Sequence, residues 1–306
     1  MEKEKIIEVK DLKLYFDGDY GTTQILNGIT FDVPEMEDDQ QLDLTLNARD
    51  YADSSTASRT EFGFEFDVDG DGVIDTSKGD QTVTFGIAEG NRIQTRGGTL
   101  LSWKTPYDLN TAEKDMLVIS EEEIAAGTED GLDLRIIRYG TVIYMFIENR
   151  QVAICDLTKC ANSAGDTESG VTADTKMFIY LRHYDDLREA GVQIPFSIKT
   201  DVTPVEISVT ADENGTAHAG YVNYYVNNGR TSKLSDTHFV GEKVVLTATP
   251  ASEELVCSQM LVNDNDQTGS MSVNTAGVGT YTFTAGAKAY NVAFAFGEPV
   301  FENTFN

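Results

Sequence analysis

Apolar and polar residues alternate with a period of two along much of the chain. In residues 62–66, for example, three phenylalanines are separated by a glycine and a glutamate. Short runs of this kind, rich in β-branched and aromatic residues and bounded by Gly, Asp, Asn or Ser, are typical of β-strands. Strands are predicted at residues 42–46, 62–66, 81–87, 132–136, 142–147, 177–181, 195–200, 205–210, 242–249, 280–284 and 290–296. Since only residues 120–126 and 185–190 favour a turn or two of helix, the predicted fold is all-β, with antiparallel sheets packed as sandwiches.

Residue usage changes near residue 200. Residues 1–200 contain 39 acidic and 19 basic side chains, a net charge of −20, whereas residues 201–306 contain 12 and 4, a net charge of −8. The second segment is also richer in Thr, Val, Ala and Asn, and its length of about 100 residues suits one small antiparallel sandwich. We therefore expect a larger sandwich domain at residues 1–200, a smaller one at residues 201–298 and a linker at residues 299–306.

The chain of 306 residues is strongly acidic, with a formal net charge of −28. This charge disfavours binding to the phosphates of nucleic acids and to anionic membrane surfaces. No run reaches the roughly 18 apolar residues of a membrane helix, so membrane insertion is not expected. Residues 2–5 are charged and no apolar segment follows them, so the start of the chain is not expected to form a signal peptide. If the protein is secreted, we expect this chain to be a monomeric fragment of a longer one.

Residues 131–153, GLDLRIIRYGTVIYMFIENRQVA, resemble a hairpin of concanavalin A-like jelly rolls. In that lectin and laminin-G superfamily, a strand of pattern l-r-i-x-R-x-g is followed by x-x-y-x-x-n-g-x-x-v, and here Asn149-Arg150 stand in place of the usual Asn-Gly. Residues 178–181 and 196–198 suit the end of such a domain, so the resemblance covers about residues 8–199. It implies a jelly roll for the first domain and a glycan as its ligand.

Residues 240–250, VGEKVVLTATP, resemble part of the divergent internalin-type B repeats of bacterial surface proteins. The order of that repeat is kept by Asn214-Gly-Thr216 before this run and by Leu261-Val-Asn263 and Tyr281-Thr-Phe283 after it. The insert at residues 221–238 is longer than the repeat needs. The resemblance implies a small Ig-like or B-repeat-like sandwich that acts as a spacer, and an extracellular location, secreted or on the bacterial cell surface.

Residues 67–75, DVDGDGVID, form the sharpest chemical motif in the chain. Aspartates at positions 1, 3, 5 and 9, a glycine at position 6 and a backbone carbonyl at position 7 match most of a calcium-binding loop. The predicted Ca²⁺ ligands are Asp67, Asp69, Asp71, the carbonyl of Val73, Asp75 and Asp80. The flanking runs are strands, which excludes a true EF-hand, and Lys78 stands where the Glu of position 12 is expected. The alternative is therefore an acidic hairpin turn without a metal.

The predicted strand at residues 61–67 carries carboxylates that could form a pair of the glycosidase type. Glu65 and Asp67 are two residues apart, or about 7 Å along a strand, which falls within the spacing of such pairs. The Glu-x-Asp-x-x-Glu run of laminarinase-type enzymes is missing, however, and a solvated polar face is the preferred interpretation. The chain also lacks a phosphate-binding loop, a nucleophile elbow and a His or Cys set with zinc spacing. We therefore expect no enzyme, and a glycoside hydrolase or lyase is the least favoured hypothesis.

Sugars are recognised by aromatic faces together with charged and amide groups. The candidate glycan-binding residues are Trp103, Tyr107, Arg96, Tyr139, Tyr184 and Asp185. Trp103 is the only tryptophan in the chain, and a place in the sandwich core is its alternative role. The sequence thus predicts a non-catalytic segment that binds a glycan or another host or microbial surface ligand. A stalk or adhesin segment without a small ligand is the competing hypothesis.

Overall fold

The computed structural model describes residues 15–18, 21–24, 31–46, 59–88, 92–98, 103–104, 132–162, 165–184, 196–222, 231–232 and 235–299. Within these ranges the chain forms 26 β-strands and two short 3-10 helices, η1 (Thr76–Lys78) and η2 (Thr268–Ser270). The prediction of an all-β fold is therefore confirmed. The helical turns expected at residues 120–126 and 185–190 lie outside the described residues. No described helix has both the length and the apolar character that crossing a membrane requires.

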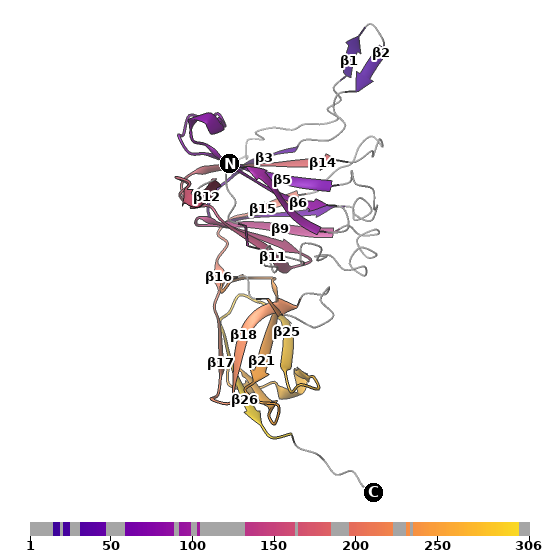
Figure 1. Ribbon diagram of the computed structural model, residues 1–306, viewed down its shortest axis with the longest axis vertical. Helices are drawn as coiled ribbons and strands as arrows, with labels where there is room; N and C mark the ends of the chain where they lie inside the picture. The colour runs from indigo at the N-terminus through magenta and orange to yellow at the C-terminus, as the bar shows by residue number, and fades with distance from the viewer. Residues whose placement is uncertain are drawn as a thin grey trace, which may run out of the picture.

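Strands up to Lys199 build the N-terminal part, which contains two large antiparallel sheets (Figure 1). The six-stranded sheet has the order β15 (Phe196–Lys199), β4 (Gln40–Leu46), β9 (Leu132–Tyr139), β10 (Val142–Ile147), β11 (Arg150–Asp156) and β8 (Trp103–Lys104). The five-stranded sheet has the order β3 (Phe31–Met36), β14 (Lys176–Tyr184), β5 (Arg59–Asp67), β6 (Gln81–Ala88) and β7 (Arg92–Gly98). Two hairpins are separate from these sheets: β1 (Tyr15–Gly18) with β2 (Gly21–Gln24), and β12 (Lys159–Asn162) with β13 (Gly165–Glu168).

The alternation in the sequence determines which side chains the N-terminal part buries. Phe64 and Phe66 of β5 are fully buried, whereas Glu65 between them is half-buried. The same pattern buries further residues in both sheets, namely Leu42, Leu134, Ile136, Ile143, Met145, Ile147, Met177 and Ile179. Burial of a side chain of this size contributes roughly 1.5–3 kcal/mol relative to exposure. The inner faces of the two sheets therefore supply the core of the sandwich.

Arg138 of β9 links the two large sheets at one end of the sandwich. Its side chain is fully buried, and its Nη1 donates to the carbonyl oxygen of Met36 at the end of β3, at 2.9 Å. Its Nη2 donates to the carbonyls of Thr172 and Ala173, at 3.1 and 2.8 Å, in the turn before β14. A buried guanidinium requires such acceptors because its five N–H groups lose their water. The side chain therefore ties the six-stranded sheet to the five-stranded one.

Strands from Pro204 onward build the C-terminal part, drawn in orange and yellow in Figure 1. One sheet has the order β17 (Ile207–Ala211), β26 (Tyr290–Gly297), β22 (Val256–Val262) and β23 (Asn265–Asp266). A second has the order β19 (Thr231–Ser232), β18 (Gly215–Val222), β21 (Lys243–Pro250), β25 (Gly279–Thr284) and β24 (Ser272–Val273), and β16 (Pro204–Val205) pairs with β20 (His238–Phe239). Among the described strands, none before residue 200 pairs with one after it.

The pairing of β17 with β26 is parallel, in contrast to the expectation of a purely antiparallel sandwich. These are the first and last strands of their sheet in chain order, and the chain between them supplies the long crossover that parallel neighbours need. The core beneath this sheet again follows alternation, because Val292, Phe294 and Phe296 of β26 are buried while the residues between them are more exposed. Gly215 lies directly against it, and a Cβ there would be 2.3 Å from the Phe296 ring.

Candidate functional site

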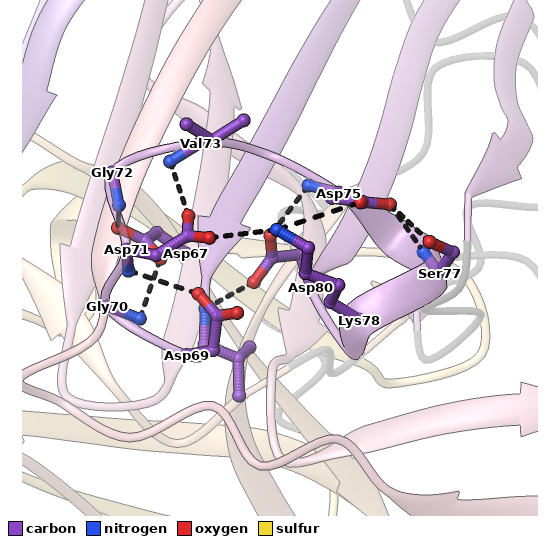
Figure 2. A network of polar contacts seen from close by, with 11 residues as sticks. Asp67, Asp69, Gly70, Asp71, Gly72, Val73, Asp75, Ser77, Lys78 and Asp80 are labelled. Carbon is purple, nitrogen blue, oxygen red and sulfur yellow. Dashed lines mark hydrogen bonds and ion pairs between the residues drawn. The ribbon is translucent and has the colours of Figure 1, made fainter.

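The acidic motif forms the loop that connects β5 to β6, with η1 inside it (Figure 2). We call residues 67–80 the acidic loop. Its backbone turns at Gly70 and Gly72, whose φ angles are 74° and 80°. Residues other than glycine rarely adopt this left-handed backbone conformation. The φ angles therefore favour glycine at both positions, although no neighbouring atom lies within 4 Å of an added Cβ. The loop thus folds tightly enough to bring alternate aspartates to one side.

Asp67 fixes the first half of the acidic loop. Its side chain is 3% exposed, its Oδ1 accepts the amide of Gly70 at 2.8 Å, and its Oδ2 accepts the amide of Gly72 at 2.9 Å. Hydrogen bonds to a charged acceptor are about twice as strong as neutral ones. Both oxygens of Asp67 therefore stabilise the loop, which gives this residue a structural role that the hypothesis of a catalytic pair with Glu65 did not foresee.

Asp80 closes the acidic loop from its other end. Its side chain is 1% exposed, its Oδ1 accepts the amide of Val68 at 2.8 Å, and its Oδ2 accepts the amide of Asp75 at 2.7 Å. A single buried carboxylate therefore holds both ends of the loop. The sequence indicated Asp80 only as a residue that could complete a metal shell.

Three of the predicted ligands converge in the structure. Each of Asp67, Asp69 and Asp71 offers a carboxylate oxygen, and these atoms lie within 4.8 Å of one another. Oxygens that bind the same Ca²⁺ at about 2.3–2.6 Å lie up to about 5 Å apart, so the spacing is compatible with one ion. Asp69 and Asp71 are exposed, and each also accepts the amide two residues further on, at 3.0 and 2.8 Å. The three aspartates therefore bring hard oxygen atoms together at a spacing that a metal ion could use.

The remaining predicted ligands have other partners. Asp75 caps η1, because its Oδ1 accepts the amide and the hydroxyl of Ser77 at 3.0 and 2.6 Å. Figure 2 shows these two residues apart from the three converging aspartates. The amide of Val73 donates to Asp71, while its side chain is 60% exposed. The metal-ligand roles of Val73, Asp75 and Asp80 stay predictions.

Lys78 supplies a cation within the acidic loop. Its Nζ lies 3.1 Å from Asp71 Oδ2 and 4.0 Å from Asp75 Oδ2. The Lys78 ammonium, followed by the amide of Val73, lowers the pKa of the Asp71 carboxyl below its usual range. In turn, the hydrogen bond and charge of Asp71 raise the pKa of Lys78. An ammonium group therefore competes with any metal ion for one of the three converging carboxylates.

The candidate glycan-binding residues are distributed over several strands. Arg96 lies in edge strand β7, Trp103 in edge strand β8 opposite Cys155, and Tyr184 at the end of β14 opposite Arg59. The side chains of Arg96, Trp103 and Tyr184, and the whole of Tyr107 and Asp185, lie outside what the structure describes. Their glycan-binding roles therefore stay predictions.

Tyr139 at the end of β9 lies against the C-terminal part. The centroid of its ring is 6.0 Å from that of Phe239, with the two rings edge to face at 73°. This contact gives Tyr139 a packing role that sequence reasoning missed. A signal for it was present, because residues 142–147, VIYMFI, are apolar at every position. Such a run indicates a strand that is buried on both faces, so another segment of the protein has to pack on the outer face of its sheet.

A scan against protein-family models finds no match, and a search of curated protein sequences also finds none. The resemblances to concanavalin A-like jelly rolls and to internalin-type B repeats therefore depend only on the residues quoted for them.

Proposed function

We propose that this chain is a non-catalytic, calcium-binding recognition segment of an extracellular bacterial protein, either secreted or attached to the cell surface. The observation that carries the proposal is the convergence of Asp67, Asp69 and Asp71 in the acidic loop. In this proposal the N-terminal part binds a glycan or another surface ligand, and the C-terminal part positions it.

The composition of the site supports a weak calcium site of the extracellular kind. Ca²⁺ takes six to eight hard oxygen ligands, and calcium modules outside cells bind it at about 10⁻⁴–10⁻³ M. Three carboxylates provide charge to attract the ion, and Lys78 has to leave Asp71 before that oxygen is available. Asp67 and Asp80 already order the loop through backbone amides. The ion would thus add to a loop that is already folded.

Thermal unfolding of the full chain in Ca²⁺ and in EDTA tests the calcium proposal. Saturation to 10–100 times Kd stabilises a protein by about 1.4–2.7 kcal/mol, which corresponds to a rise in Tm of several degrees. Asp69→Asn and Asp71→Asn should abolish this rise. A matched control is Asp266→Asn, because Asp266 makes a similar bond to the amide of Thr268 in the C-terminal part. An unchanged Tm of the parent protein at 10 mM Ca²⁺ would contradict the proposal.

A glycan array with the full chain tests the recognition proposal separately. Retention on at least one polysaccharide, reduced by Trp103→Ala or Tyr184→Ala without loss of the folded circular dichroism spectrum, would support it. The absence of retention on plant, mucin and microbial polysaccharides, with and without Ca²⁺, would refute it and favour a stalk. Turnover of a polysaccharide that Glu65→Gln abolishes would instead establish the enzyme hypothesis.

A further inference from the structure

The outer face of the six-stranded sheet is apolar around β9 and β10. Tyr144 and Phe146 alternate with the core residues of β10, yet they are 5% and 0% exposed, and Ile137 of β9 is also fully buried. They form one cluster, which we call the outer cluster, and Tyr139, Val142, Ile154 and Val202 pack against it. A sheet face of this composition has to be covered, because exposed aromatic and aliphatic groups would lose the stabilisation of burial.

Phe239 packs on this apolar face; it belongs to β20 of the C-terminal part and is fully buried. Its ring lies edge to face against those of Tyr144 and Phe146, with centroids 5.0 and 6.2 Å away and interplanar angles of 65° and 89°. Edge-to-face contacts of this geometry are favoured by the ring quadrupoles in addition to area burial. Figure 1 shows the C-terminal part attached beside the six-stranded sheet, where β16 marks the junction.

Arg135 of β9 adds a polar contact next to Phe239. Its Nη1 donates to the carbonyl of Val240 at 3.0 Å, while its Nε and Nη2 donate to Asp43 at 3.3 Å and to Asn149 at 2.7 Å. Gly241 permits this approach, since a Cβ at that position would lie 3.0 Å from Nη2 and the φ angle is +84°. Asp43 and Asn149 of the N-terminal part therefore orient the Arg135 side chain, and the carbonyl of Val240 in the C-terminal part accepts a further hydrogen bond from it.

Three further hydrogen bonds connect the two parts or the segment between them. The amide of Lys243 donates to the carbonyl of Asn149 at 2.8 Å, and Gln151 Nε2 donates to the carbonyl of Thr237 at 3.2 Å. The amide of Val202 donates to the carbonyl of Asp39 at 2.9 Å. Because these contacts come from separate segments of both parts, rotation about any one of them would break the others.

Glu242 holds the turn that presents Phe239. Its Oε2 accepts the amide of Phe239 at 3.0 Å and its Oε1 lies 2.9 Å from His238 Nδ1. The side chains of His238 and Glu242 are 5% and 4% exposed. The amide of Glu242 donates a hydrogen bond to the carbonyl of Phe239, and its carbonyl accepts one from the amide of Ala285. A satisfied buried network of this kind rigidifies the segment that it holds.

We propose that residues 237–243 form a lock that holds the N-terminal and C-terminal parts as one rigid, jointly folding body. The C-terminal part then determines the orientation of the N-terminal part and does not act as a flexible tether. The outer cluster, Arg135 and the Glu242 network carry this inference. It is independent of calcium and of any glycan.

The test compares full-chain variants by calorimetry and small-angle X-ray scattering. The parent protein should unfold in a single transition, and one conformation should account for its scattering. Phe239→Ala and Arg135→Ala should separate the transition into two or broaden the distribution of particle dimensions. Lys199→Ala is the matched control, because Lys199 binds the same Asp43 carboxylate at 2.7 Å from edge strand β15, and it should behave as the parent does.

Two outcomes would overturn the lock. The first is a parent protein with two independent transitions and the scattering of a flexible pair. The second is a Phe239→Ala variant with a single transition and the scattering curve of the parent. If Phe239→Ala prevents both parts from folding, so that the variant is unfolded before heating and shows no transition, joint folding is supported, and Glu242→Gln then provides a milder variant. It retains the side-chain volume but loses one acceptor, so it should loosen the turn without emptying the outer cluster.

Discussion

Replacement of Asp80 by Asn separates the loop's own stability from that of any bound ion. Asp80 is buried, with 1% of the residue exposed, and its carboxylate accepts hydrogen bonds from the amides of Val68 and Asp75. An asparagine has one acceptor oxygen, so its NH₂ group faces an amide N–H that has lost its acceptor. A buried donor without a partner costs about 1–3 kcal/mol. The remaining hydrogen bond also weakens, because a hydrogen bond to a charged acceptor is about twice as strong as one to a neutral acceptor. The expected loss of unfolding free energy is therefore about 2–4 kcal/mol.

Urea unfolding in EDTA measures this loss without a contribution from metal. Asp75→Asn is the matched control, because the same substitution occurs in the same loop at a half-buried residue that caps η1, and Asn is as good a capping residue as Asp. The control should change the unfolding free energy by less than about 0.5 kcal/mol, as expected for a surface substitution. If Asp80→Asn is as stable as this control, the buried carboxylate does not hold the loop and the reasoning fails.

Three other predictions follow from local geometry. Gly215→Ala should destabilise the C-terminal part by about 1–3 kcal/mol in urea, because the added Cβ meets an aromatic ring at 2.3 Å, whereas Gly269→Ala has free space and should not. Burial raises the pKa of the Cys257 thiol to about 11, so alkylation of the folded protein at pH 8 should be slow and should become fast on unfolding. Lys78→Ala should raise the pKa of Asp71 toward its ordinary value in an NMR titration, and should strengthen Ca²⁺ binding in calorimetry.

The sequence predicted the strands well because their signal is local. Residues 62–66 and 290–296 each alternate in a way that only a strand with one buried face requires, and both runs lie within observed strands. The turns that flank β10 use residues suited to them, since Gly140 and Asn149 adopt positive φ angles that Gly and Asn tolerate. Short-range chemistry was therefore sufficient for these strands, but not for β18 (Gly215–Val222) or β22 (Val256–Val262), which were not among the predicted ranges.

The pairing of distant elements could not be predicted in this way. Nothing near Phe239 in the sequence identifies Tyr144 or Phe146, more than 90 residues earlier, as the rings that it contacts. The parallel register of β17 with β26 is equally non-local, because it depends on how the whole C-terminal part returns to its first strand. The sequence did contain part of the information. The apolar run at residues 142–147 indicates a strand buried on both faces, but it does not identify the residues that cover its outer face.

The acidic loop illustrates why the spacing of ligands does not by itself determine a metal site. Alternate aspartates were predicted to point inward together, but each carboxylate can satisfy backbone amides as well as an ion. Asp75 and Asp80 use their oxygens in this way, while Asp67 does so and still converges with Asp69 and Asp71. Lys78 then provides one positive charge where a divalent ion would provide two. Since Coulomb attraction scales with charge, the carboxylates attract Ca²⁺ more strongly than they attract the ammonium. Because Ca²⁺ takes six to eight oxygen ligands, it also needs oxygens beyond the three converging carboxylates, whereas the ammonium does not.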